Sequence, residues 1–106
     1  LYHAAAVFAS NYTTTLLSVA QDAYAAAGIA PDTALRLMEP LVRASIDNVF
    51  RLGPAQALSG PAARGDMATV EKQQAAVAAW RPDHGEIYRQ LAAAAVELAA
   101  RRKPNH

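Results

Sequence analysis

Apolar residues recur every three to five positions over residues 1–27, the spacing that gathers them on one side of a helix. The pattern predicts one long helix there, followed by Gly28, a residue that can take the left-handed conformation with which many helices end. Alanines fill most of the remaining positions, and Asp22 is the single charged side chain before that glycine. A helix that is apolar around most of its surface is usually buried, so we expect this one to be central in the fold.

The middle of the chain predicts three shorter helices and a loop. Two of them, 32–39 and 40–52, should be separated by a kink or break at Pro40, because proline lacks the N–H that a helix interior needs and clashes with the preceding turn. A short helix is expected over 54–58. The glycines and prolines of 59–66 then make this stretch the least helical part of the sequence.

Two capping signals predict the last helices. Asp66 is placed to accept hydrogen bonds from the first free amides of a helix over 67–80. Asp83 and Glu86 have the spacing of a capping box, which predicts a final helix running to about Arg102.

No segment alternates between apolar and polar residues with period two, so no strand is predicted. The expected fold is all-α, a bundle of five or six helices built around the long N-terminal one, in a single domain of 106 residues. The 27 alanines favour close approach of the helix axes. Phe8, Phe50 and Trp80 are the large side chains expected to fill its centre.

Charge and composition narrow the classes of function. A net charge of +1 favours neither nucleic acid nor an acidic membrane surface as a partner. The chain has no cysteine, which excludes disulfides and thiolate metal sites and fits a reducing compartment. No apolar run approaches the ~20 residues of a membrane span, and no signal peptide is evident, so a cytoplasmic location is expected. Because the chain opens at Leu1, already inside a helical pattern, we interpret it as part of a longer protein.

Three histidines, His3, His84 and His106, do not converge at a metal-ligand spacing, so no metal site is expected. His3 is instead a candidate for binding a polar ligand, because Val7 and Asn11 follow it at helical spacing on the same face. Polar groups on a buried helix need partners, and a cleft holding a polar ligand would supply them. The alternative is that His3 is an ordinary surface or half-buried residue.

Three further polar residues are candidates for substrate binding. Asn48 lies in a helical segment among apolar neighbours, where asparagine is a weak helix former. Ser59 and Arg64 lie in the glycine-rich loop, and the planar guanidinium of Arg64 could hold a carboxylate with two parallel hydrogen bonds. The alternatives are a solvated face for Asn48 and a surface ion pair for Arg64.

Two stretches of the chain resemble a known bacterial domain. It is a helical domain of unknown function that follows a Rossmann-like domain, and its family is similar to the 6-phosphogluconate dehydrogenase and ketopantoate reductase superfamily. The resemblance extends over residues 1–102. It is carried by Tyr2-His3-Ala4-Ala5-Ala6-Val7-Phe8-Ala9-Ser10-Asn11 and by the run that includes Leu41-Val42-Arg43, Asp47-Asn48-Val49, Arg51-Leu52-Gly53-Pro54, Ala57-Leu58-Ser59-Gly60-Pro61 and Arg64-Gly65-Asp66.

This resemblance implies a division of labour with a domain upstream of Leu1. A Rossmann-like domain would hold NADP, and the helical domain would close over it to form the cleft for a small keto or hydroxy acid. His3 occupies the position of the ketopantoate reductase lysine, Val7 that of its first asparagine and Asn11 that of its second. Histidine can still donate a proton to a developing alkoxide, whereas valine removes a polar contact, so ketopantoate itself is not the expected substrate.

The expected mechanism thus makes His3 the catalytic residue of a reductase and Asn11, together with Asn48, Ser59 and Arg64, its substrate-binding residues. No cofactor-binding residue is expected within this chain, because the glycine-rich turn that binds NADP would lie upstream. A different class of function stays open, in which the domain is a non-catalytic dimerisation or ligand-sensing module. The long apolar helix favours a homodimer in either case.

Overall fold

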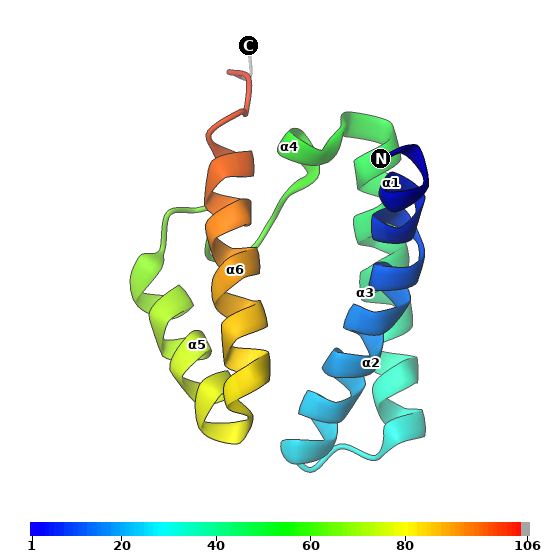
Figure 1. The fold of residues 1–106 in the computed structure, drawn as a ribbon, viewed down its shortest axis with the longest axis vertical. Helices are drawn as coiled ribbons and strands as arrows, with labels where there is room; N and C mark the ends of the chain where they lie inside the picture. Colours follow the sequence, from blue (N-terminus) through cyan, green and yellow to red (C-terminus); the bar gives the residue numbers. More distant parts are fainter. Residues whose placement is uncertain (105–106) are drawn as a thin grey trace. The chain divides into compact units, whose positions relative to one another are not determined.

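The computed structural model describes residues 1–104, which contain helices and no strand. The all-α prediction is confirmed for these residues. They fall into two compact units, one of residues 1–39 and one that begins at Pro40. The six helices are α1 Tyr2–Ala9, α2 Asn11–Ala26, α3 Pro31–Leu52, α4 Pro54–Ala57, α5 Met67–Trp80 and α6 Pro82–Ala99 (Figure 1).

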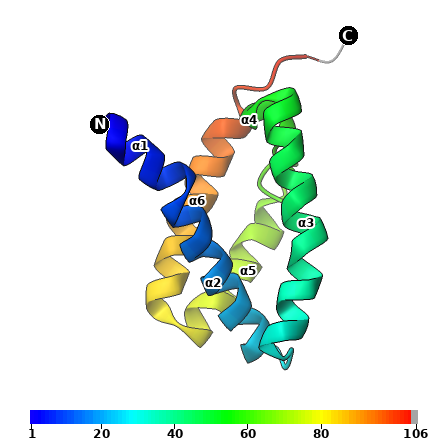
Figure 2. The same cartoon turned by 90° about the vertical axis from the view of Figure 1, so that its right-hand side faces the viewer.

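The predicted N-terminal helix is present from Tyr2 to Ala26, with an interruption at Ser10 that divides it into α1 and α2 (Figure 2). Three consecutive threonines follow the interruption. The hydroxyls of Thr13, Thr14 and Thr15 donate to the backbone carbonyls four residues earlier, at 3.0, 3.3 and 2.9 Å. Such back-bonding weakens the local backbone ladder and often bends a helix, which accounts for the break.

The expectation that this helix is buried is wrong, since neither α1 nor α2 contains a buried residue. The first unit has a small core instead, formed where α2 turns back into the start of α3. Ala34 and Met38 are its buried residues, and the side-chain amide of Gln21 donates to the carbonyl of Pro31 at 3.0 Å across the turn. Gly28, with φ of +95°, lies in this turn as predicted.

The predicted break at Pro40 does not occur, because α3 is continuous from Pro31 to Leu52. A proline can remain inside a helix when the chain accepts the loss of one backbone hydrogen bond, here the one to the carbonyl of Arg36. The position of Pro40 nevertheless coincides with a boundary in the structure. The boundary between the two units falls between Glu39 and Pro40.

In the second unit, α5 and α6 lie side by side as an antiparallel pair (Figures 1 and 2). Small residues bring them together at the turn. A Cβ placed on Gly85 would lie 2.6 Å from both Cα and Cβ of Ala78, closer than atoms can pack. Val70 of α5 is the buried hydrophobic residue of this unit up to residue 104. Alanine and glycine therefore set the helix spacing, as the composition indicated.

Two side chains expected to fill the centre are at the surface instead. Phe8 is 71% exposed and Phe50 86% exposed, while Trp80 is half-buried. Periodicity identifies the apolar side of a helix, but it does not say whether this chain or another molecule covers that side.

The capping signals gave one correct prediction and one error. Asp66 caps α5 as predicted, accepting from the amide of Thr69 at 3.2 Å. Asp83 and Glu86 do not form a capping box, because α6 begins two residues earlier, with Arg81 at the N-cap and Pro82 in the first turn. Proline is well suited to that place, since its missing N–H would have had no helical partner.

The final helix ends at Ala99, and the chain beyond it folds back onto α4. Arg102 donates from Nε to the carbonyl of Ala55 at 2.9 Å and from Nη2 to that of Leu58. The backbone amide of Lys103 donates to Oε1 of Gln56 at 2.8 Å. These contacts fasten the end of α6 to the segment that leads into the 59–66 loop.

Candidate functional site

His3 and Asn11, the first pair of candidate residues, lie in the first unit on α1 and at the start of α2. Together with Val7 they have the spacing of one helix face, and the interruption at Ser10 lies between Val7 and Asn11. Both polar side chains are exposed, and Val7 between them is half-buried. The ring of His3 also meets that of Tyr2 edge to face, with centroids 5.8 Å apart. The prediction that these polar groups are buried is therefore wrong, and both are accessible to a ligand.

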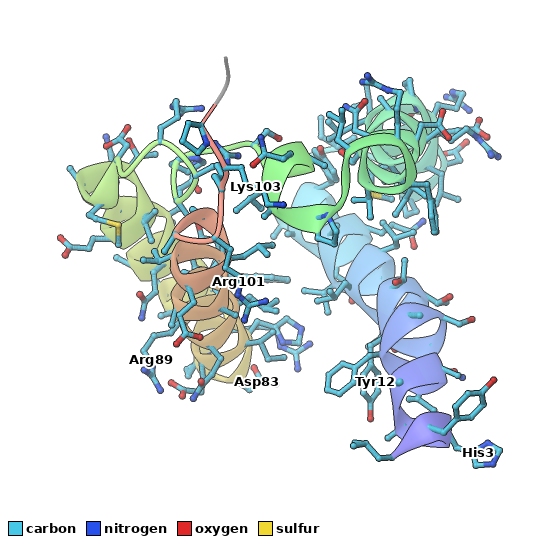
Figure 3. The ribbon with its side chains drawn as sticks, turned by 90° about the horizontal axis from the view of Figure 1, so that it is seen from above. His3, Tyr12, Asp83, Arg89, Arg101 and Lys103 are labelled. Carbon is cyan, nitrogen blue, oxygen red and sulfur yellow. The ribbon has the colours of Figure 1, made fainter. Side chains whose placement is uncertain are left out.

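The opposite side of the same helix is apolar. Phe8 and Tyr12 stack edge to face with their ring centroids 5.5 Å apart. Tyr12 and His3 are nine positions apart, about two and a half turns, so they project in opposite directions (Figure 3). The segment thus presents a polar face that carries His3 and Asn11 and an apolar face that carries the two rings.

Asn48, Ser59 and Arg64, the other candidates, belong to the second unit. Asn48 is half-buried on α3, and its Oδ1 accepts from Nη2 of Arg51 at 2.8 Å. This interaction occupies one acceptor of the amide and fixes its orientation on the helix surface.

Ser59 and Arg64 are exposed on the loop between α4 and α5, which the structure forms as predicted. The loop turns at Gly60 and Gly65, whose φ angles of +93° and +72° favour glycine. The positive charge of Arg64 helps to lower the pKa of Asp66, although the largest cause of that lowering is the hydrogen bond that the carboxylate accepts from the hydroxyl of Thr69, at 2.7 Å.

A polar cluster surrounds the start of α6, and the sequence analysis assigned its Asp83 and Glu86 only to a capping box. Hydrogen bonding from Arg81 lowers the pKa of Asp83, and hydrogen bonding from Arg89 lowers that of Glu86. Asp83 and Arg89 are marked in Figure 3. The buried Nδ1 of His84 makes no hydrogen bond within the described residues, and the His84 ring packs edge to face on Trp80, with centroids 5.4 Å apart. The chain position of His84 gave no indication of this environment.

Among residues 1–104, no group of three or more histidine, aspartate or glutamate residues has the geometry to hold a metal ion. No helix in this part of the chain is long and apolar enough to cross a membrane. His106, the third histidine of the sequence analysis, lies outside the described residues.

Fold and surface together define a class, an all-α domain with little buried core and a two-faced N-terminal helix. Residues 1–95 match the model of a family described as a domain of unknown function, DUF2520, and the chain belongs to that family. No curated protein and no solved structure matches the chain.

Proposed function

We propose that this chain is the helical substrate-binding and dimerisation domain of a larger NADP-dependent reductase that acts on a small keto or hydroxy acid. The proposal combines the likeness of the sequence to the domain that follows Rossmann-like domains with two properties of the structure. One is the amount of surface that the chain leaves uncovered. The other is the accessible polar face that carries His3 and Asn11.

The exposed surface is the observation that carries the proposal. In the first unit, Ala34 and Met38 are the only buried hydrophobic residues, whereas Phe8 is 71% exposed. In the described part of the second unit, Val70 is the only buried hydrophobic residue, whereas Phe50 is 86% exposed. Large apolar side chains of both units are therefore left for another surface to cover.

The polar face of α1 and α2 supplies the proposed chemistry. A histidine that is exposed on a rigid helix can donate a hydrogen bond or a proton to the carbonyl oxygen of a keto acid as negative charge develops there. Asn11, two turns further along the same face, would orient the substrate through its side-chain amide. Val7 lies between them and would give the substrate an apolar contact at a position where a polar side chain would give a hydrogen bond.

The loop of the second unit carries a separate group of candidate substrate-binding residues. Arg64 is exposed and could hold a carboxylate with its planar set of donors, and Ser59 could add a hydroxyl donor. Asn48 is the weakest of the candidates, because Arg51 already binds its side-chain oxygen.

NADP is proposed as a ligand of another domain of the larger protein. A dinucleotide phosphate is usually bound by a strand followed by a glycine-rich turn and a helix, and residues 1–104 contain no strand. The positive-φ glycines of residues 1–104 occupy separate turns, at Gly28, Gly53, Gly60 and Gly65.

The test uses a full-length protein that contains this chain. It is titrated with NADPH, and loss of cofactor absorbance is followed with a panel of small 2-keto acids. We expect turnover, and we expect His3→Ala to lower kcat by about 100-fold. Tyr12→Phe, on the opposite face, is the matched control and should leave kcat unchanged. Turnover that survives His3→Ala undiminished removes His3 from the acid role, and failure to bind NADPH rejects the reductase.

A second candidate function is a non-catalytic dimerisation module. It is favoured by the exposed ring pair of Phe8 and Tyr12, which needs no substrate to explain it. Tyr12 points away from His3 (Figure 3). NADPH binding without turnover of any keto acid, together with a stable dimer, would favour this function over the reductase.

A further inference from the structure

Hydrogen bonds hold the segment after α6 against α4, and we call this set of contacts the Arg102 clasp. Arg102 donates from Nε to the carbonyl of Ala55 at 2.9 Å and from Nη2 to the carbonyl of Leu58. Gln56 and Lys103 are paired as well, because Oε1 of Gln56 accepts from the amide of Lys103 at 2.8 Å and Nε2 of Gln56 donates to the Lys103 carbonyl at 3.5 Å. Figure 3 marks Lys103 in this segment. The clasp lies wholly within the second unit.

The helix that the clasp holds, α4, is a single turn of four residues. Its turn is closed by the amide of Leu58, which donates to the carbonyl of Pro54 at 3.1 Å. An isolated turn is unfavourable, because several residues are fixed for each hydrogen bond gained. The carbonyl of Ala55, whose helical donor would be position 59, beyond the end of α4, accepts from Arg102 instead. The clasp therefore supplies contacts that keep α4 formed and fix the position of Leu58.

The loop that follows α4 is fixed at both of its ends. Ser59 comes directly after Leu58, whose carbonyl Arg102 binds, and Asp66 at the far end caps α5. Between these ends the amide of Arg64 donates to a carbonyl of the same loop at 3.3 Å, and the amide of Asp66 does so at 2.9 Å. A loop bonded to itself in this way moves as one piece, so its orientation depends on its two ends.

We infer that Arg102 is a positioning residue, which holds the 59–66 loop so that Ser59 and Arg64 are presented together to a carboxylate. The inference rests on the proposed function in taking a carboxylate as the ligand of the loop. Arginine suits this task, because its planar fork of donors can bind two carbonyls at fixed positions, here those of Ala55 and Leu58.

Loss of the clasp should lower the fraction of molecules whose loop is oriented to bind a carboxylate. The apparent affinity for the ligand falls in proportion to that fraction. A contact that Arg64 makes equally in the ground state and the transition state affects KM and leaves kcat unchanged. A residue that only stabilised the fold would leave both constants of the folded enzyme unchanged.

Hydrogen exchange of the full-length protein tests the clasp without any substrate. In Arg102→Ala, the amide of Leu58, which the turn of α4 protects, should exchange about tenfold faster than in the parent. Ala93→Gly is the matched control, because it weakens α6 at an exposed position through helix propensity and leaves the clasp intact. An unchanged Leu58 rate in Arg102→Ala overturns the inference, as does an equal rise in Ala93→Gly.

Steady-state kinetics with a 2-keto acid that the parent turns over tests the positioning. Arg102→Ala should raise KM about tenfold and leave kcat within about twofold of the parent. Arg101→Ala removes the same charge from the neighbouring position and should change neither constant. In an Arg64→Ala background, Arg102→Ala should alter KM by less than about twofold, because the group that it positions is gone. An unchanged KM, a parallel fall in kcat, or the full effect in the Arg64→Ala background rejects the positioning role.

The inference and the proposed function fail in different ways. A working reductase in which Arg102→Ala changes neither the Leu58 exchange rate nor KM keeps the proposed function and rejects the clasp. A parent protein that turns over no keto acid rejects the reductase, and with it the carboxylate as the ligand of the loop. The Leu58 exchange rate still decides in that case whether Arg102 holds the loop in place.

Discussion

The contact between Gly85 and Ala78 makes a quantitative prediction for Gly85→Ala. In a helix, alanine is preferred over glycine by about 1 kcal/mol, so propensity alone predicts that the variant is more stable. The added Cβ would lie 2.6 Å from both the Cα and the Cβ of Ala78, and ordinary van der Waals contact begins at 3.4 Å. The helices α5 and α6 must separate at their closest point. Overpacking of this kind costs about 1–3 kcal/mol.

The balance of the two effects is a loss of about 1 kcal/mol, which lowers the melting temperature of a domain of this size by about 4–8 °C. Thermal unfolding followed by circular dichroism measures it. Ala93→Gly, at an exposed position of α6, calibrates the propensity effect and should cost about 1 kcal/mol.

A double-mutant cycle separates crowding from propensity. Ala78→Gly removes one of the two nearest atoms that Gly85→Ala would meet, so the double variant should be more stable than the two single effects predict, by at least ~0.5 kcal/mol. If Gly85→Ala raises the melting temperature, or if the two substitutions are strictly additive, the close approach of the helices is not what determines stability here.

Three other predictions follow from contacts in the two units. The pKa of Asp66 is lowered chiefly by the hydrogen bond from Thr69. Asp66 therefore stabilises the fold at pH values above the ordinary carboxyl pKa of about 3.9, and this stabilisation is lost as the pH falls through the lowered pKa. Measuring the melting temperature as a function of acid pH should show this loss in the parent and not in Asp66→Ala. Arg102→Ala should destabilise the chain by about 1 kcal/mol by freeing the carbonyls of Ala55 and Leu58, whereas Arg101→Ala next to it should have no effect in the same denaturant titration. Met38→Ala, in the buried core, should cost about 2–3 kcal/mol, against less than ~0.5 kcal/mol for Phe50→Ala at the surface; equal losses would show that Phe50 is covered within the chain.

Local signals in the sequence predicted the helices well. The cap at Asp66, the turn at Gly28 and the absence of period-two alternation each act over a few residues, and each has its expected counterpart in the structure. The error at Asp83 is of the same local kind, because Pro82 competes for the helix start and the sequence does not show which signal prevails.

Burial could not be predicted in the same way. The apolar face around Phe8 has the pattern of a core helix, and that pattern is identical whether the covering surface is in the same chain or in another. For the candidate site, the spacing of His3 and Asn11 predicts a shared face, because helical geometry relates positions eight residues apart. It could not foresee that Arg51 binds Asn48, because side-chain conformation depends on local geometry that spacing leaves open.

Pro40 divides α3 between the two units, although the helix is continuous. The residues of α3 before Pro40 belong to the first unit and those from Pro40 onwards to the second. The backbone hydrogen bond from position 40 to the carbonyl of Arg36 cannot form, because proline has no N–H. We therefore expect amide hydrogen exchange to divide the helix, with residues 35–39 protected to the level of one unit and residues 41–52 to the level of the other. One helix by geometry would then belong to two cooperative unfolding units.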